Sequence, residues 1–179
     1  RDLTRSTPTI VQTDDHDIYQ GNLWGNGGRA APTEIIDVSG RAERVRDQNR
    51  GGYVYGPEFI NLVQRTQSGH NPDPYDPTPI EQDIGVNYGI INFGGISFAF
   101  LEDRKFKTSP IQGQDLDVHE AQLLGARQET FLEAWGHDDE GVDGRICLTQ
   151  SLFACLQTSP RGQALLDWDA NGQPKLHRD

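Results

Sequence analysis

Two runs of β-branched and aromatic residues, separated by a pair of glycines, place the strongest constraint on the fold of this chain. The runs are Val86–Phe93 and Ile96–Leu101, and Gly94 and Gly95 lie between them. Two glycines at this position can adopt the positive backbone angles that a tight hairpin turn requires. The sequence therefore predicts an antiparallel hairpin whose second strand ends in the charged residues Glu102–Lys105.

Helical and further β-type segments flank the hairpin. An apolar stripe and well-placed ends predict helices over Pro57–Gln67 and His119–Trp135. Runs of β-type residues predict strands at Thr9–Thr13 and Arg145–Thr149, and we expect one short helix around Gly40–Asp47. This order of strands and helices predicts a mixed α/β fold that is rich in loops.

Composition narrows the classes of function. The 179 residues include 34% apolar residues, 20 Gly and 10 Pro, which suits one domain with extensive loops. The net charge of −11 argues against binding to a nucleic-acid backbone, which needs clustered Lys and Arg. No apolar stretch approaches the length that crosses a membrane. Cys147 and Cys155 have apolar neighbours and no CxxC spacing, so we expect buried, reduced thiols.

An acidic cluster with a histidine follows the first predicted strand, at Asp14–Asp17 (sequence DDHD). Carboxylates beside an imidazole are used in metal and phosphoryl chemistry. In one interpretation a carboxylate holds a metal ion while His16 polarises or protonates a substrate oxygen. In the other, the segment is an acidic turn in which Asp14 or Asp15 caps the next element. The pattern alone leaves both interpretations open.

Three apolar runs end in polar residues of the types found in active sites, namely Asp14, Asp103 and Gln150. If those ends lie on one edge of a sheet, the three residues converge. Arg104 offers a guanidinium suited to a bidentate phosphate contact, or it belongs to an ion-pair cluster at a strand end. Trp24, in a glycine-rich loop, is either a buried anchor or a lid over a ligand.

A second acidic segment, Asp167–Gly172, imitates the start of an EF-hand calcium loop. The twelfth position of that loop, where a bidentate Glu is needed, is Arg178. A true EF-hand is therefore not expected, whereas a looser calcium loop stays open. A non-catalytic module that calcium stabilises through its acidic loops is thus an alternative to an enzyme.

Four ordered segments of the chain resemble PhoD-like alkaline phosphatases, which are metal-dependent members of the calcineurin-like metallophosphoesterase fold. They are Thr13–Gly25 with its DDHD signature, Phe98–Lys107, Leu124–Leu132 and Leu148–Ala154. The four segments occur in the family's order over nearly the whole chain.

The resemblance implies a β-sandwich flanked by helices, with a multinuclear metal centre at the strand ends. It implies that Asp14 and Asp15 hold metal, that His16 acts at the phosphate as an acid or transition-state stabiliser, and that Arg104 contacts the phosphate. The expected ions are Ca, Fe, Mn or Zn, and the expected substrate is a phosphate mono- or diester. In such a site a metal-activated water attacks phosphorus.

The chain also departs from the family pattern. That pattern includes an earlier Asp-bearing segment, a bridging Asp and a late Gly-Asp-x-His segment, and this sequence has none of them. The chain contains no methionine and begins with Arg1. We therefore interpret residues 1–179 as the central part of one phosphatase domain and expect weak or no activity from it alone. The resemblance implies export, although the sequence has no visible signal peptide, and a family scaffold without activity is a further alternative.

Overall fold

The hairpin around Gly94 and Gly95 forms two strands of a mixed sheet in the computed structural model, which describes residues 5–18, 23–109, 121–138 and 141–151. Strand β3 (Gly89–Phe93) runs antiparallel to β4 (Ile96–Phe100), and the two glycines adopt φ angles of 59° and 79°. The predicted hairpin is therefore confirmed. On its other side β4 pairs in parallel with β5 (Gly144–Leu148), where a strand was expected.

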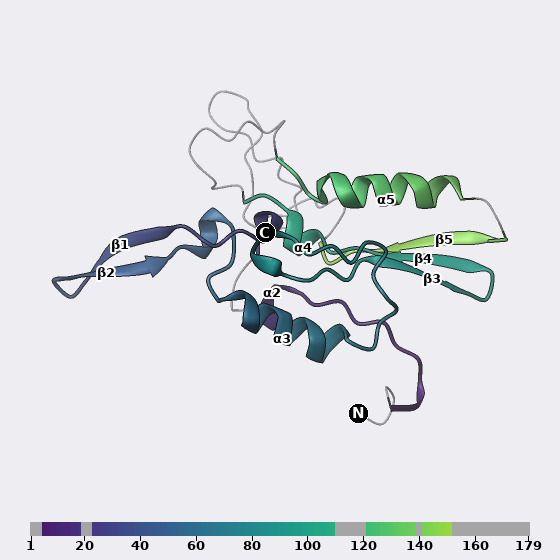
Figure 1. The fold of residues 1–179 in the computed structure, drawn as a ribbon, viewed down its shortest axis with the longest axis horizontal. Coiled ribbons are helices and arrows are strands. Elements are labelled where there is room, and N and C mark those ends of the chain that lie inside the picture. Colours follow the sequence, from purple (N-terminus) through teal and green to yellow (C-terminus); the bar gives the residue numbers. More distant parts are fainter. Residues whose placement is uncertain (1–4, 19–22, 110–120, 139–140, 152–179) are drawn as a thin grey trace, which may run out of the picture.

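Helix α5 (Gly125–His137) makes the crossover that the parallel pair β4 and β5 requires. The helix lies along the three strands (Figure 1). Phe131 is fully buried against the sheet, and Trp135 Nε1 donates a hydrogen bond of 2.8 Å to Ser97 Oγ. This helix is shorter at its start than the predicted His119–Trp135, because the positive φ of Gly125 (73°) separates it from residues 121–124. The chain is thus mixed α/β, as expected.

Helix α3 (Pro57–Ser68) confirms the other helix prediction, with Pro57 in the first turn. Its buried Ile60 packs in a second apolar cluster with Ile18, Leu23, Tyr53 and Ile84. Figure 1 shows α3 and α5 on opposite sides of the central strands. The remaining helical turns are α2 (Asp15–Ile18), η1 (Asn26–Gly28), η2 (Gln48–Arg50), η3 (Glu81–Asp83) and α4 (Asp103–Phe106).

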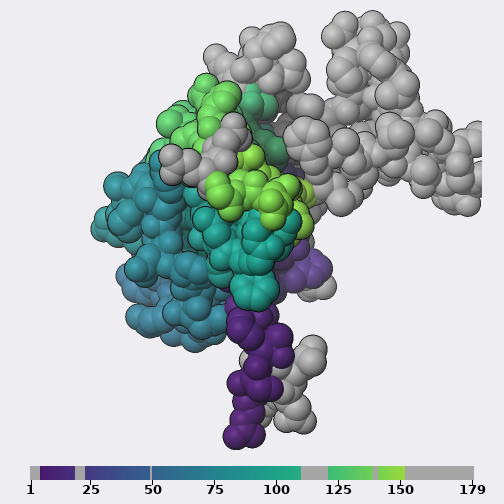
Figure 2. All heavy atoms as spheres, turned by 90° about the vertical axis from the view of Figure 1, so that its right-hand side faces the viewer, coloured from purple at the N-terminus to yellow at the C-terminus, as the bar shows by residue number. Residues whose placement is uncertain are grey.

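The strand predicted at Thr9–Thr13 does not form. This segment pairs with a side chain, because Val11 N donates to Asn71 Oδ1 (3.0 Å) and Asn71 Nδ2 donates to Val11 O (2.7 Å). A carboxamide from another loop thus takes the place of a neighbouring strand. In Figure 2 the start of the chain, drawn in purple, extends below the body of the molecule.

The short helix predicted around Gly40–Asp47 is also wrong. Strands β1 (Thr33–Val38) and β2 (Arg41–Arg46) form an antiparallel hairpin that projects from the body (Figure 1). Its turn residues Ser39 and Gly40 have φ angles of 55° and 83°, as a primed two-residue turn requires. The charged side chains of β2 hid this turn, because they leave no apolar alternation to indicate a strand.

The proline-rich loop before the sheet is fixed by charge. Arg127 on α5 pairs with Asp76 (2.7 Å) and donates to Thr78 O (2.8 Å). Hydrogen bonds from Thr78, assisted by Arg127, lower the pKa of the Asp76 carboxyl. This loop is therefore attached to α5 through an ion pair that is sensitive to acid.

Two further expectations concern thiols and membranes. Cys147 lies exposed on β5, so the expected burial of its thiol is wrong, although partial desolvation raises its pKa. Cys155 lies outside the described residues. Among the helices that the structure describes, none is long and apolar enough to cross a membrane.

Candidate functional site

The ends of β4 and β5 meet the segment that precedes α2, as the polar strand ends predicted. Gln150, which follows β5, makes the connection: its Oε1 accepts from Arg104 N (3.1 Å), and its Nε2 donates to Thr13 O. The expected convergence of Asp14, Asp103 and Gln150 is thus confirmed, although the first of the three does not follow a strand. All the site residues named below lie at this junction.

Asp103 anchors the junction from inside. Its side chain is fully buried, and Oδ1 accepts from Thr149 Oγ1 (3.1 Å), Gln150 N (2.9 Å) and Ser151 N (3.3 Å). The other carboxylate oxygen, Oδ2, is buried without a hydrogen-bond partner. Asp103 therefore fixes the residues after β5 relative to α4 and leaves one acceptor unused.

Asp14–Asp17 is a capped turn of helix. Asp14 N donates to Asp17 Oδ2 (2.8 Å), and Asp14 Oδ1 accepts from Asp15 N (2.8 Å). Such bonds satisfy backbone donors that a helix start leaves free. These bonds agree with the capping interpretation of the segment, while its interpretation as a metal site stays a prediction. Asp15 is buried at 9% exposure, whereas His16, whose backbone N donates to Asp15 Oδ1 (2.9 Å), is exposed.

Arg104 joins this turn to the strand ends. Its Nε lies 2.7 Å from Asp14 Oδ1, and its Nη1 lies 3.6 Å from Asp15 Oδ2. The arginine side chain is only 12% exposed, and Nη1 is buried without a hydrogen-bond partner. Three of the four predicted site residues, Asp14, Asp15 and Arg104, are thus brought together, and His16 lies beside them on the solvent side.

Lys107 and Ser151 belong to the same junction but were not predicted. Lys107 is 8% exposed, and its Nζ donates to Ser151 Oγ (3.2 Å). Burial lowers the pKa of Lys107, and the charge of Arg104 lowers it further, while Asp103, Asp15 and Asp14 oppose that change. Lys107 follows Arg104 by three positions, which is the spacing of neighbours on a helical turn. That spacing is the one sequence signal that could have identified it.

Lys105, two positions away, has a different environment. Its Nζ forms an ion pair of 2.7 Å with Glu102 Oε1 and donates to Gly85 O (2.7 Å) and Gln64 Oε1. Both charged side chains of the pair are 6% exposed. A buried ammonium with a carboxylate and two further acceptors is fully satisfied. Lys105 is therefore part of the core, not of the site.

Neighbouring segments hold α4 in place. Gln128 on α5 is fully buried, accepts from Glu102 N (2.8 Å) and donates to Leu124 O (2.9 Å). Gly25 N donates to Arg104 O (2.8 Å), and a Cβ at Gly25 would lie 2.5 Å from the Lys105 carbonyl oxygen.

The glycine-rich loop also buries Trp24, which is 4% exposed. Of the two predicted roles, the buried anchor is therefore confirmed. Residues 21 and 22 of the loop lie outside the described residues, as do Asp167–Gly172 and Arg178 of the possible calcium loop.

The donors at the junction fit only part of a metal shell. Asp14, Asp15 and the unpartnered Oδ2 of Asp103 are hard oxygen donors of the kind that Ca, Mn, Fe and Zn accept. Within the described residues, no group of three or more His, Cys, Asp and Glu side chains is arranged to hold a metal ion. A complete site would therefore need ligands from elsewhere.

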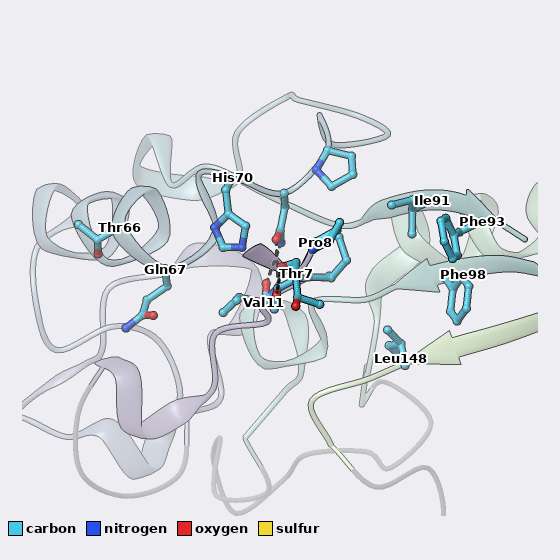
Figure 3. Close-up of a pocket in the computed structure, with 14 residues that line it drawn as sticks. Thr7, Pro8, Val11, Thr66, Gln67, His70, Ile91, Phe93, Phe98 and Leu148 are labelled. Carbon is cyan, nitrogen blue, oxygen red and sulfur yellow. Dashed lines mark hydrogen bonds between the residues drawn. The ribbon is translucent and has the colours of Figure 1, made fainter. Parts of the chain in front are cut away.

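An open cavity of about 1390 Å³ lies apart from this junction, on the sheet face opposite α5. Figure 3 shows Ile91, Phe93, Phe98 and Leu148 on its sheet side, with His70 across from them. None of Asp14, Asp15, His16, Arg104 and Lys107 lines it. Its lining includes His70 and several neutral polar side chains but no Asp, Glu, Lys or Arg, so the charged junction is the candidate site for phosphoryl chemistry.

Comparisons with protein-family models, with curated proteins and with solved structures found no match to this chain.

Proposed function

We propose that this chain is part of a metal-dependent phosphoester hydrolase of the PhoD-like type. The observation that carries the proposal is Arg104, a largely buried guanidinium between Asp14 and Asp15 where the ends of β4 and β5 meet. Guanidinium groups at this kind of strand edge suit phosphoryl oxygens. The four ordered resemblances to the family support the same class, and the metallophosphoesterase sandwich is part of the proposal.

Asp14 and Asp15 would hold the metal in this proposal, with Asp103 Oδ2 as a further oxygen donor close by. When bound, the metal supplies a hydroxide-like nucleophile at neutral pH and stabilises negative charge on the phosphoryl group. Arg104 orients a phosphoryl oxygen and balances its charge. His16, exposed beside Asp15, protonates the leaving-group oxygen from the solvent side.

The capping bonds at Asp14 and Asp17 favour a second candidate, a non-catalytic module with structural ions. In that case the carboxylates serve the turn and bind calcium only to stabilise it. Chelation would then lower the melting temperature of the 179-residue chain, and added calcium would restore it. A melting temperature that chelators leave unchanged would count against this candidate.

Two substitutions in the complete protein that contains this chain test the enzyme. Asp15→Asn and His16→Ala should each reduce hydrolysis of an aryl phosphate by at least about a hundredfold, as loss of a metal ligand or a general acid does. Asp15→Asn should also lower the bound metal measured by elemental analysis. His70→Ala, at an exposed histidine away from the junction, is the matched control. Normal hydrolysis by both site variants would show that the assignment is wrong.

A further inference from the structure

The hairpin of β1 and β2 makes its extensive contacts within itself. It projects from the body of the molecule (Figure 1), and nothing in the described part of the chain lies within 4 Å of the position that a Cβ at Gly40, in the turn, would take. A two-stranded hairpin on its own is only marginally stable in water. The hairpin therefore has much to gain from a partner that extends its sheet.

The two outer edges of the hairpin differ in their side chains. No further strand of the described residues pairs with either β1 or β2. The β2 edge carries three arginines, Arg41, Arg44 and Arg46. The β1 edge carries three apolar side chains that are 68%, 39% and 41% exposed, Ile35, Ile36 and Val38. Charge on an edge strand opposes pairing with another chain, whereas an exposed apolar edge favours it. β1 is therefore the edge to which another strand can add.

The sequence of β1 is complementary to itself. Two copies related by a two-fold axis pair their β1 strands antiparallel, and opposite side chains must then lie on the same face of the sheet. Because side chains alternate between faces, only every second register meets this condition. In the register centred on Ile36, this residue lies opposite its own copy. Glu34 then lies opposite the partner's Val38, and Ile35 lies opposite the partner's Asp37.

Charge favours the register centred on Ile36. Within each hairpin Val38 pairs with Arg41 and Ile35 pairs with Arg44. Two rows across the joined strands therefore run from a carboxylate over an apolar residue to an arginine, with the last two members from the partner: Glu34, Val38, Arg41 and Asp37, Ile35, Arg44. The ends of each row are two strand spacings apart, about 10 Å, where opposite charges still attract weakly.

The neighbouring registers combine like charges. Centring on Ile35 puts Glu34 opposite the partner's Ile36, which pairs with Glu43 of its own hairpin, so that two carboxylates share one row. Centring on Glu34 or on Asp37 sets a carboxylate directly against its own copy, which is destabilising. Glu34 also has Arg50 of its own chain at 3.5 Å, and this ion pair does not depend on the register.

We propose that β1 is an association edge, at which two copies of this protein join their hairpins into one four-stranded antiparallel sheet centred on Ile36. Ile36 and Val38 of both copies then form one apolar cluster on the same face, which a two-stranded hairpin cannot provide. The added interface is one strand of six residues, so we expect a reversible dimer with a dissociation constant on the order of micromolar or weaker. The proposal is independent of the proposed function.

Sedimentation velocity over a concentration series tests the dimer in the complete protein that contains this chain. Wild type should convert from monomer to dimer as its concentration rises. Ile36→Lys sets two like charges opposite each other and removes apolar contact, so it should raise the dissociation constant by about tenfold or more. Leu62→Lys, at a 45% exposed apolar side chain on α3, is the matched control and should leave the constant unchanged. A wild type that stays monomeric, or an Ile36→Lys variant that associates as wild type does, would overturn the proposal.

Disulfide formation tests the register. Ile36→Cys and Ile35→Cys are compared under mild oxidation, both with Cys147→Ser and Cys155→Ser. Only the Ile36→Cys variant brings two cysteines opposite each other, so it should give a covalent dimer in much higher yield. Chance collisions would instead favour Ile35→Cys, because that side chain is 68% exposed and that of Ile36 is 39% exposed. Equal yields, or a higher yield from Ile35→Cys, would show that the proposed pairing is wrong.

Discussion

Replacing Lys107 with methionine should leave the chain about as stable as wild type or make it more stable. The change removes a buried ammonium that has no carboxylate within 4.0 Å among the described residues, and it removes one hydrogen bond to Ser151. The lost hydrogen bond costs about 1 kcal/mol, whereas exchange of buried charge for apolar volume is neutral or stabilising by about 1–4 kcal/mol. The expected net change in the free energy of unfolding therefore lies between about −1 and +3 kcal/mol.

Lys105→Met is the matched control, because the same residue types are exchanged two positions away. It leaves the buried Glu102 carboxylate without its ion-pair partner, so it should cost about 3–5 kcal/mol. Urea denaturation at pH 7, followed by circular dichroism, measures both changes. If Lys107→Met lost more than about 2 kcal/mol, Lys107 would be satisfied in the folded chain and the reasoning would be refuted.

The pH dependence gives an independent reading of the same group. The folded-state pKa of Lys107 is lowered, so between that pKa and the unfolded value of 10.5 the unfolded chain binds more protons than the folded chain. The free energy of unfolding of wild type should therefore gain a contribution from this lysine as pH rises through that window. The Lys107→Met variant should lack this contribution, and an identical pH profile for the two proteins would contradict the assignment.

Three further changes test the supports of the site. Gln128→Leu should destabilise the chain by about 2–4 kcal/mol in urea, because the buried Glu102 N–H loses its acceptor; a loss under about 1 kcal/mol would contradict this role. Gly25→Ala should lower the melting temperature by several degrees, because the Cβ of the new alanine would lie 2.5 Å from the Lys105 carbonyl oxygen. An unchanged melting temperature would exclude that close approach. The lowered pKa of Asp76 stabilises the folded chain at pH values above its unfolded pKa of 3.8, and this stabilisation is lost as pH falls through the folded pKa. Asp76→Asn should therefore make the free energy of unfolding depend less on pH in acid. An unchanged pH dependence would count against the ion pair.

Local signals predicted the parts of the fold that local chemistry determines. Gly94 and Gly95 fix the central hairpin, because few other residues adopt positive φ at two consecutive positions. The same chemistry at Ser39 and Gly40 was missed, since β2, which follows that turn, is mostly charged and shows no apolar alternation. The run at Thr9–Thr13 has β-type residues, yet its partner is a side chain 60 positions away, and no local pattern records such a partner.

The sequence predicted where the candidate site lies but not how its charged side chains are paired. The polar ends at Asp14, Asp103 and Gln150 predicted where the chain would converge, and they do so. The different surroundings of Lys105 and Lys107 were not predictable, because both are lysines of one charged segment. Their partners distinguish them: Glu102, Gly85 and Gln64 surround Lys105, whereas the partner of Lys107 is Ser151. Three of these partners lie 20 or more positions away in the sequence, so no local pattern records them.

The hydrogen bond from Gln150 to Thr13 also bears on the order in which the molecule forms during synthesis. It joins positions 137 residues apart, so the first part of the junction is synthesised long before its last part exists. Contacts of such long separation form late in folding, because the intervening chain must first be brought to order. A ribosome-bound chain that ends before β5 could already hold the β3–β4 hairpin and α3. It could not yet hold Arg104 against Gln150, so we expect the site to be the last part of the described fold to mature.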